Sequence, residues 1–90
     1  MDRDRLQSAL DAFAPKPPER RVVVRQAIDL ADSGRYTADT GHELTISVIE
    51  GNLRDAPEES LVDRWNWWIG SLTVAYGGYE RFQVRAIDEA

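Results

Sequence analysis

The sequence predicts an all-α domain in which a short N-terminal helix packs on a long antiparallel hairpin of two helices. In two long stretches, residues 18–54 and 57–88, apolar side chains recur at spacings of three and four, the period of an amphipathic helix. A proline-rich segment separates the first of these stretches from a shorter periodic one. No internal repeat or low-complexity tract divides the 90 residues, so we expect a single domain.

The short helix is expected over residues 2–13. Leu6, Leu10 and Phe13 lie at positions i, i+4 and i+7, and Asp2 and Asp4 lie near the positive end of the helix dipole. Residues 14–18, with the sequence Ala-Pro-Lys-Pro-Pro, are expected to form a stiff linker, because proline cannot donate to a helix and holds the preceding residue extended.

Residues 18–54 are expected to form one long helix with two candidate break points. The stripe that predicts it contains Val24, Ile28, Ala31, Arg35, Ala38, His42, Thr45, Ile49 and Leu53. Its length of about 36 residues far exceeds the usual 11 or 12, so breaks are sought at Ser33-Gly34 and Thr40-Gly41. Leu44, Ile46 and Val48 also alternate as in a strand, but the chain offers no convincing partner strand.

A second long helix is expected over residues 57–88. Asp55 and Glu58 have the spacing of a capping box, and Pro57 suits a first helical turn. So short a loop predicts antiparallel neighbours, with Leu53 facing Leu61. The residues expected in the core of this helix are Trp65, Trp68, Leu72, Tyr79 and Phe82.

Composition excludes several classes of function. The formal charge of -5 disfavours general attraction to phosphate backbones or anionic lipid, so nucleic acid is an unlikely partner. The absence of cysteine excludes disulfides, thiolate metal sites and cysteine catalysis. No signal peptide or apolar membrane span is found, so a cytoplasmic protein is expected. Ten Arg against one Lys, with nine Asp, favours a salt-loving source.

The segment Val74-Ala-Tyr-Gly-Gly-Tyr-Glu80 resembles a small archaeal helical group, domain-of-unknown-function family 357. That group carries a signature close to Tyr-Ala-His-Gly-Trp-Leu-Asp on its last helix, after a helix with Ala and Tyr near where Ala31, Tyr36 and Ala38 stand here. The signature's His is Tyr76 in this chain and its Trp is Gly78. The resemblance implies a three-helix fold and a haloarchaeal source, with no established activity and no catalytic residues to assign.

Arg35 and His42 form the most notable polar pair, because both lie on an otherwise apolar stripe. Six residues separate them, and the pair resembles the loose Arg-to-His motif of HEPN-type helical ribonucleases, in which imidazole acts as a general base and Arg steadies a phosphate. The structural alternative is a neutral, hydrogen-bonded His42, and an Arg35 whose stem lies on Tyr79 while its head reaches Asp39 or Glu80. The structural alternative is preferred.

Trp67 is expected to lie outside the core, about 110° around the helix from the apolar stripe. The residues that share its face, and that we predict to form a subunit interface, are Trp67, Ser71, Val74, Gly78 and Ile87. Small residues beside a large aromatic allow another helix to approach closely. The alternative is that the short N-terminal helix covers Trp67.

No metal site or cofactor is predicted. Glu58 and Glu59 are explained by the helix dipole, while the neighbours His42 and Glu43 point to different helix faces. The favoured interpretation is a non-catalytic interaction module that forms a homo-oligomer and binds an unknown protein partner. An RNA-binding or RNA-cleaving helical protein that uses Arg35 and His42 remains the alternative.

Overall fold

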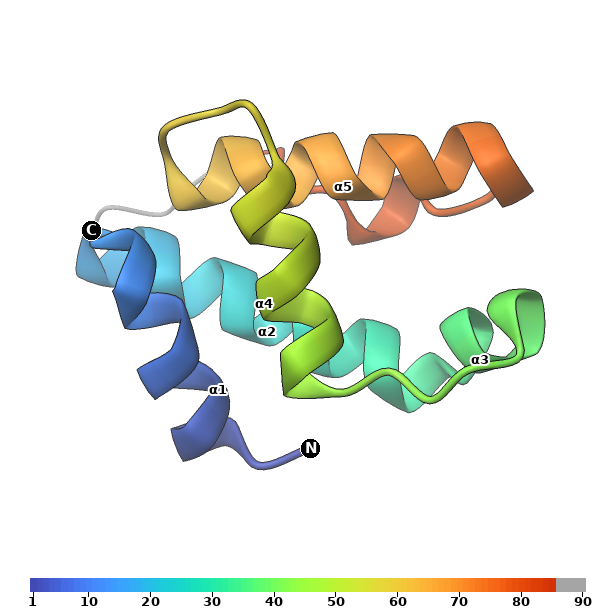
Figure 1. Ribbon diagram of the computed structural model, residues 1–90, viewed down its shortest axis with the longest axis horizontal. Coiled ribbons are helices and arrows are strands. Elements are labelled where there is room, and N and C mark those ends of the chain that lie inside the picture. The colour runs from blue at the N-terminus through green and yellow to red at the C-terminus, as the bar shows by residue number, and fades with distance from the viewer. Residues whose placement is uncertain (86–90) are drawn as a thin grey trace.

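The computed structural model describes residues 1–85, and this part of the chain is all-helical (Figure 1). Its elements are α1 (Arg3–Leu10), η1 (Asp11–Phe13), α2 (Pro17–Ser33), α3 (Arg35–Thr40), α4 (Ile46–Asp55), α5 (Leu61–Tyr76) and η2 (Glu80–Phe82), where η denotes a 3-10 helix. The prediction of an all-α fold is confirmed, but five α-helices replace the predicted three. None of the helices described is long and apolar enough to cross a membrane.

Two glycines divide the long helix that was predicted over residues 18–54. Gly34 and Gly41 have φ angles of 70° and 76°, in the left-handed region that favours glycine, and they end α2 and α3. Both predicted break points are real. The chain then remains non-helical as far as Thr45, whose hydroxyl caps α4 by accepting from the Val48 N–H. No strand forms in this segment of the described chain.

The helix starts also differ from prediction. Pro17 and Pro18 occupy the first turn of α2 instead of extending the linker, which suits proline because N–H groups there have no partner within the helix. The capping box predicted at Asp55 is wrong, since Asp55 is the last residue of α4. Ser60 caps α5 instead, its hydroxyl accepting from the Asp63 N–H at 3.1 Å.

The helix that lies along α5 is α2, and the two run in the same direction (Figure 1). Near their starts, a Glu19 carboxylate oxygen accepts from the Leu61 N–H at 3.2 Å. Beyond their ends, the Arg35 guanidinium donates to the Gly77 carbonyl at 2.6 Å. In Figure 1, α4 crosses in front of α2 and reaches α5 steeply. This arrangement replaces the predicted antiparallel hairpin, because the two glycine breaks redirect the chain before it reaches α4.

The last helix ends at Tyr76, well before the predicted residue 88. Gly77 and Gly78 have φ angles of 77° and 79°, and there the chain turns back beneath α5. We call residues 77–85 the strap. Tyr79 and Phe82 are still buried, because residues three apart share a face in the 3-10 helix η2. A spacing of three residues, which predicted a continued α-helix, is therefore equally compatible with a 3-10 turn.

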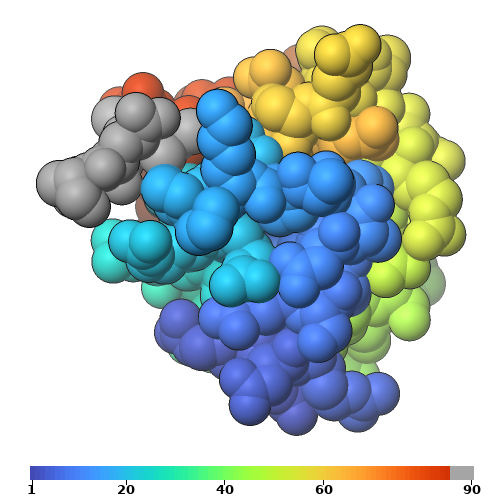
Figure 2. All heavy atoms as spheres, turned by 90° about the vertical axis from the view of Figure 1, so that its left-hand side faces the viewer, coloured from blue at the N-terminus to red at the C-terminus, as the bar shows by residue number. Residues whose placement is uncertain are grey.

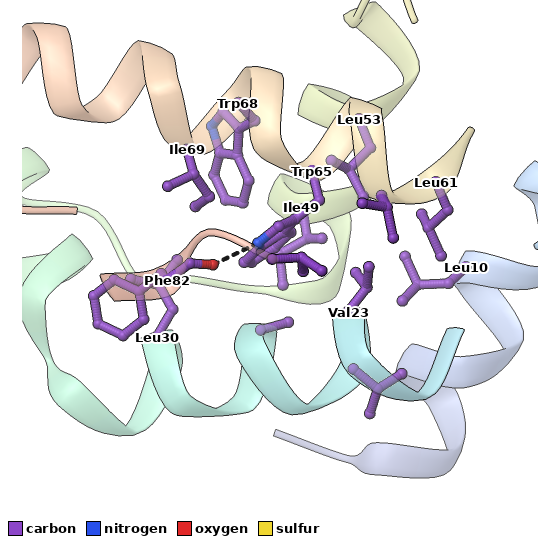
Figure 3. Close-up of a cluster of buried hydrophobic side chains, with 14 of the residues drawn as sticks. Leu10, Val23, Leu30, Ile49, Leu53, Leu61, Trp65, Trp68, Ile69 and Phe82 are labelled. Carbon is purple, nitrogen blue, oxygen red and sulfur yellow. Dashed lines mark hydrogen bonds between the residues drawn. The ribbon is translucent and has the colours of Figure 1, made fainter. Parts of the chain in front are cut away.

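The core lies between α1, α2, α4, α5 and the strap (Figure 3). The five residues expected in the core of the last helix are all buried, together with Leu6, Leu10, Val23, Leu30, Ile49, Leu53, Leu61 and Ile69. At the end of the molecule where α2 starts, α1 packs beside the first turns of α2 and against α4 (Figure 2). The apolar side of α1 is therefore buried against α2 and α4.

Candidate interaction surface on α5

Four consecutive residues of α5, from Trp65 to Trp68, divide between the core, the strap and the surface. Successive residues of an α-helix turn by about 100°, so four in a row sample every side. Trp65 and Trp68 are buried and meet edge to face, with ring centroids 5.4 Å apart. Trp67 lies 40% exposed. This short segment therefore contributes both to the core and to the exposed surface.

Trp65 and Asn66 hold the strap against α5. The Trp65 indole N–H donates to the Phe82 carbonyl at 2.8 Å, in a buried hydrogen bond (Figure 3). The Asn66 side-chain amide donates to the Val84 carbonyl at 2.9 Å, and its oxygen accepts from the Val84 N–H at 2.8 Å. Asn66 thus satisfies both backbone groups of one strap residue, as a neighbouring strand would.

Arg35 holds the other end of the strap. Its guanidinium donates to the carbonyls of Gly77 and Gly78 and to the Asp39 carboxylate, the last at 2.9 Å. It also lies 5.0 Å from the centroid of the Tyr79 ring, within the range of a cation–π contact. The positive φ of Gly78 favours glycine, and a Cβ there would come within 2.7 Å of this guanidinium, so that the Arg35 head would have to shift.

The Tyr79 hydroxyl completes this cluster. It donates to the Asp39 carboxylate at 2.8 Å, and the ring is fully buried. Burial raises the pKa of the Tyr79 phenol well above its usual range, and the hydrogen bond to Asp39 raises it further, because both disfavour the phenolate. Tyr79 therefore stays neutral and acts as a hydrogen-bond donor.

The opposite side of α5 carries an apolar surface that we call the outer face, formed by Trp67, Gly70, Ser71 and Val74. These residues line a shallow, mostly apolar hollow together with Asn66. Val74 is 90% exposed, and Tyr76 at the end of the helix is also exposed. A Cβ added at Gly70 would meet open space, so no contact among residues 1–85 explains a glycine in the middle of this helix. The exposed residues form a continuous stripe, since positions 67, 70, 71 and 74 are neighbours on a helix.

Three of the five residues predicted to form an interface, Trp67, Ser71 and Val74, lie together on the outer face. Gly78 does not share it, because α5 ends at Tyr76 and Gly78 lies in the strap against Arg35. Ile87 lies outside the described residues. Helix α1 packs against α2 and α4, and Trp67 remains exposed. The alternative that α1 covers Trp67 is therefore wrong.

Arg35 and His42 occupy different settings. Arg35 is the first residue of α3, and its guanidinium donates to the strap carbonyls of Gly77 and Gly78. His42 lies exposed after the Gly41 break. Within residues 1–85, no hydrogen bond joins the two side chains, and the Thr40 hydroxyl accepts from the backbone N–H of His42. The Arg35 contacts with Asp39 and the Tyr79 ring match its expected structural role, although the guanidinium and not the stem lies over the ring. The hydrogen bond expected of the His42 side chain is not found within residues 1–85. Among the described residues, no cluster of His, Cys, Asp or Glu could hold a metal ion.

Asn66 is the residue whose role sequence reasoning missed. It lies outside the apolar stripe of the last helix, where an asparagine is typical of a solvated surface. Its two hydrogen bonds depend on Val84, which lies 18 residues further along the chain and returns to α5 only because the helix ends at Gly77. The Gly77-Gly78 pair was the available signal for that return.

A family model described as the WNWW domain matches residues 1–73. The match includes α1 to α4, most of α5 and the segment Trp65-Asn66-Trp67-Trp68, which the family's description spells in one-letter code. The strap lies beyond the matched residues. No curated protein and no solved structure matches the chain.

Proposed function

The chain belongs to the WNWW domain family, and we propose that it is a non-catalytic helical module that associates with a second copy of itself through the outer face of α5. The observation that carries this proposal is the exposure of Trp67 and Val74 around the open Gly70 position. Burying large apolar side chains against a partner is favourable, at about 25 cal/mol per Å² of apolar surface.

The position of the outer face supports an association that leaves the fold unchanged. α5 packs against α2, α4 and η2, and the remaining side of the helix carries the outer face. The indole N–H of Trp67 donates no hydrogen bond within residues 1–85, and such a donor seeks a partner when it is buried. A second copy would cover the apolar part of the ring.

The test is the molar mass in solution, measured by sedimentation or light scattering across a range of protein concentrations. Each chain carries a formal charge of -5, so the measurement is made at about 0.1 M and about 1 M salt, where repulsion between copies is screened to different extents. We expect the wild type to form dimers, and more readily at high salt. A wild type that stays monomeric at high micromolar concentration in both salts would overturn the proposal.

Trp67→Glu tests the surface itself. The introduced carboxylate would be buried unpaired against an apolar partner, so the dimer should weaken by at least about tenfold, which corresponds to about 1.4 kcal/mol. Ser47→Glu is the matched control, because it adds the same charge at an exposed position on α4. Circular dichroism should give the same helix content for both variants as for the wild type. Equal weakening by both would mean that net charge, and not the outer face, governs association.

The alternative function, RNA cleavage by Arg35 and His42, is tested by incubating the purified protein with single-stranded RNA. The non-catalytic proposal expects no cleavage above a buffer control. Cleavage by the wild type that is lost in His42→Ala would refute it, since His42 makes no side-chain hydrogen bond within the described chain.

A further inference from the structure

We infer that two copies pack with their α5 helices antiparallel, across a two-fold axis that passes beside Gly70 and Ser71. This inference rests on the proposed function and adds the geometry of the partner. It draws on the open position at Gly70, on the order of large and small residues along the outer face, and on the charge at one end of that face.

Gly70 marks the point on the outer face where a second helix can come closest. Glycine inside a helix costs about 1 kcal/mol relative to alanine, and here neither a positive φ nor a contact with another described residue requires it. Trp67 lies one turn before Gly70 and Val74 one turn after it, so the glycine forms the floor of the hollow. A helix from another copy can approach most closely at such a point, as small residues allow wherever two helix backbones nearly touch.

The order of side chains along the outer face fits an antiparallel partner. A two-fold axis between positions 70 and 71 sets residue 67 of one helix against residue 74 of the other, and residue 70 against residue 71. The contact between Trp67 and Val74 then occurs twice, once on each side of the axis, while the small residues meet at the axis. A parallel pair would instead set Trp67 against Trp67 and Gly70 against Gly70, which places two bulky rings at one level and a gap at the next.

Charge favours the same direction. Asp63 is exposed in the first turn of α5, four residues before Trp67, and so borders the outer face. A parallel pair would bring the two Asp63 carboxylates to the same end of the interface. In the antiparallel pair they lie at opposite ends, about 22 Å apart at 1.5 Å rise per residue, which exceeds the Debye length of about 8 Å at physiological salt. Antiparallel helix dipoles also attract each other.

The expected interface is small. Residues 67–74 span about 10 Å of helix, so the buried area falls at the low end for specific interfaces. We therefore expect a dissociation constant on the order of micromolar or weaker. A method that traps a weak dimer is therefore preferable to one that requires it to persist.

Disulfide trapping suits this chain, which contains no cysteine, so that each introduced thiol reports alone. Ser71→Cys places the thiols of the two copies beside the axis. In the proposed dimer, their Cα atoms come within the roughly 4.4–6.8 Å that a disulfide needs. Val74→Cys places two thiols about 10 Å apart along the antiparallel pair, which is too far. Ser47→Cys, at an exposed position on α4, measures random collision. The full-length variants are oxidised under mild conditions, and the rate of covalent dimer formation is measured.

We expect Ser71→Cys to cross-link at least about tenfold faster than Ser47→Cys, since a dimer raises the effective thiol concentration to about millimolar. Val74→Cys should cross-link no faster than Ser47→Cys. Rapid cross-linking of both Ser71→Cys and Val74→Cys would indicate a parallel pair, overturning this inference while leaving the proposed function intact. If neither exceeds Ser47→Cys although sedimentation gives a dimer, another surface forms the interface and the inference fails.

Gly70→Leu gives an independent test of close approach. Its matched control is Gly51→Leu, because Gly51 also lies inside a helix, on α4, with open space around its Cβ position. Both substitutions should favour the helix, but only Gly70→Leu should weaken the dimer, by at least about tenfold. An unchanged dissociation constant for Gly70→Leu would overturn the close approach at the axis.

Discussion

Replacing Asn66 with alanine should loosen the strap from α5. The substitution removes the two hydrogen bonds to the backbone of Val84, at 2.9 and 2.8 Å, and each such bond contributes about 0.5–1.5 kcal/mol net. Against a loss of about 1–3 kcal/mol, alanine gains up to about 0.7 kcal/mol in helix propensity. We therefore expect the free energy of unfolding to fall by about 0.5–2 kcal/mol, and Tm to fall by about 4–8 °C for each kcal/mol lost.

Asn52→Ala separates this effect from helix propensity. Asn52 lies on α4 and donates to the Val48 carbonyl one turn earlier, a bond local to its own helix. The difference in unfolding free energy between the two variants measures what Asn66 contributes through the strap. Hydrogen exchange at the Val84 amide should accelerate in Asn66→Ala alone. If the two variants have equal stability and equal protection of that amide, Asn66 does not hold the strap.

The remaining predictions concern the core and the Arg35 cluster. Trp68→Ala should lower the free energy of unfolding, measured by denaturant titration, by about 3–5 kcal/mol, because the ring is buried against Trp65. A loss as small as that of a surface substitution, about 0.5 kcal/mol, would contradict its place in the core. The unfolded Tyr79 phenol ionises near pH 10 while the folded phenol stays neutral, so wild-type stability should fall as pH rises above about 10, and Tyr79→Phe should show a smaller fall. Arg35→Gln should cost about 1–3 kcal/mol by thermal unfolding and His42→Ala less than about 0.5 kcal/mol; the reverse order would contradict the strap contacts of Arg35.

Local patterns in the sequence were sufficient to predict the helical class and the places where the long helix breaks. Apolar spacing of three and four identifies a buried helix face whatever that face packs against, which is why Trp65, Trp68 and Leu72 were placed in the core. Gly34 and Gly41 were recognisable because glycine tolerates the left-handed conformation that ends a helix. These features depend on neighbours within a few residues.

Direction and long-range pairing could not be obtained in the same way. The same apolar stripe runs through α2, α3 and α4 whether or not the glycines redirect the chain, so an antiparallel hairpin and the observed parallel α2–α5 pair fit one pattern. The strap was missed for a related reason. Tyr79 and Phe82 have a spacing that suits both a continued α-helix and a 3-10 turn, and only the pair Gly77-Gly78 distinguishes the two.

The candidate surface on α5 was predictable in part because it requires only one helix. Trp67, Ser71 and Val74 share a face by helical geometry alone, so their grouping does not depend on which neighbours cover the rest of α5. Their exposure does depend on those neighbours. α2, α4 and η2 each contact α5, and together with the strap bonds of Asn66 they account for the other sides of the helix. Substitutions facing those three elements should therefore act on folding, whereas substitutions on the outer face can change association while the fold persists.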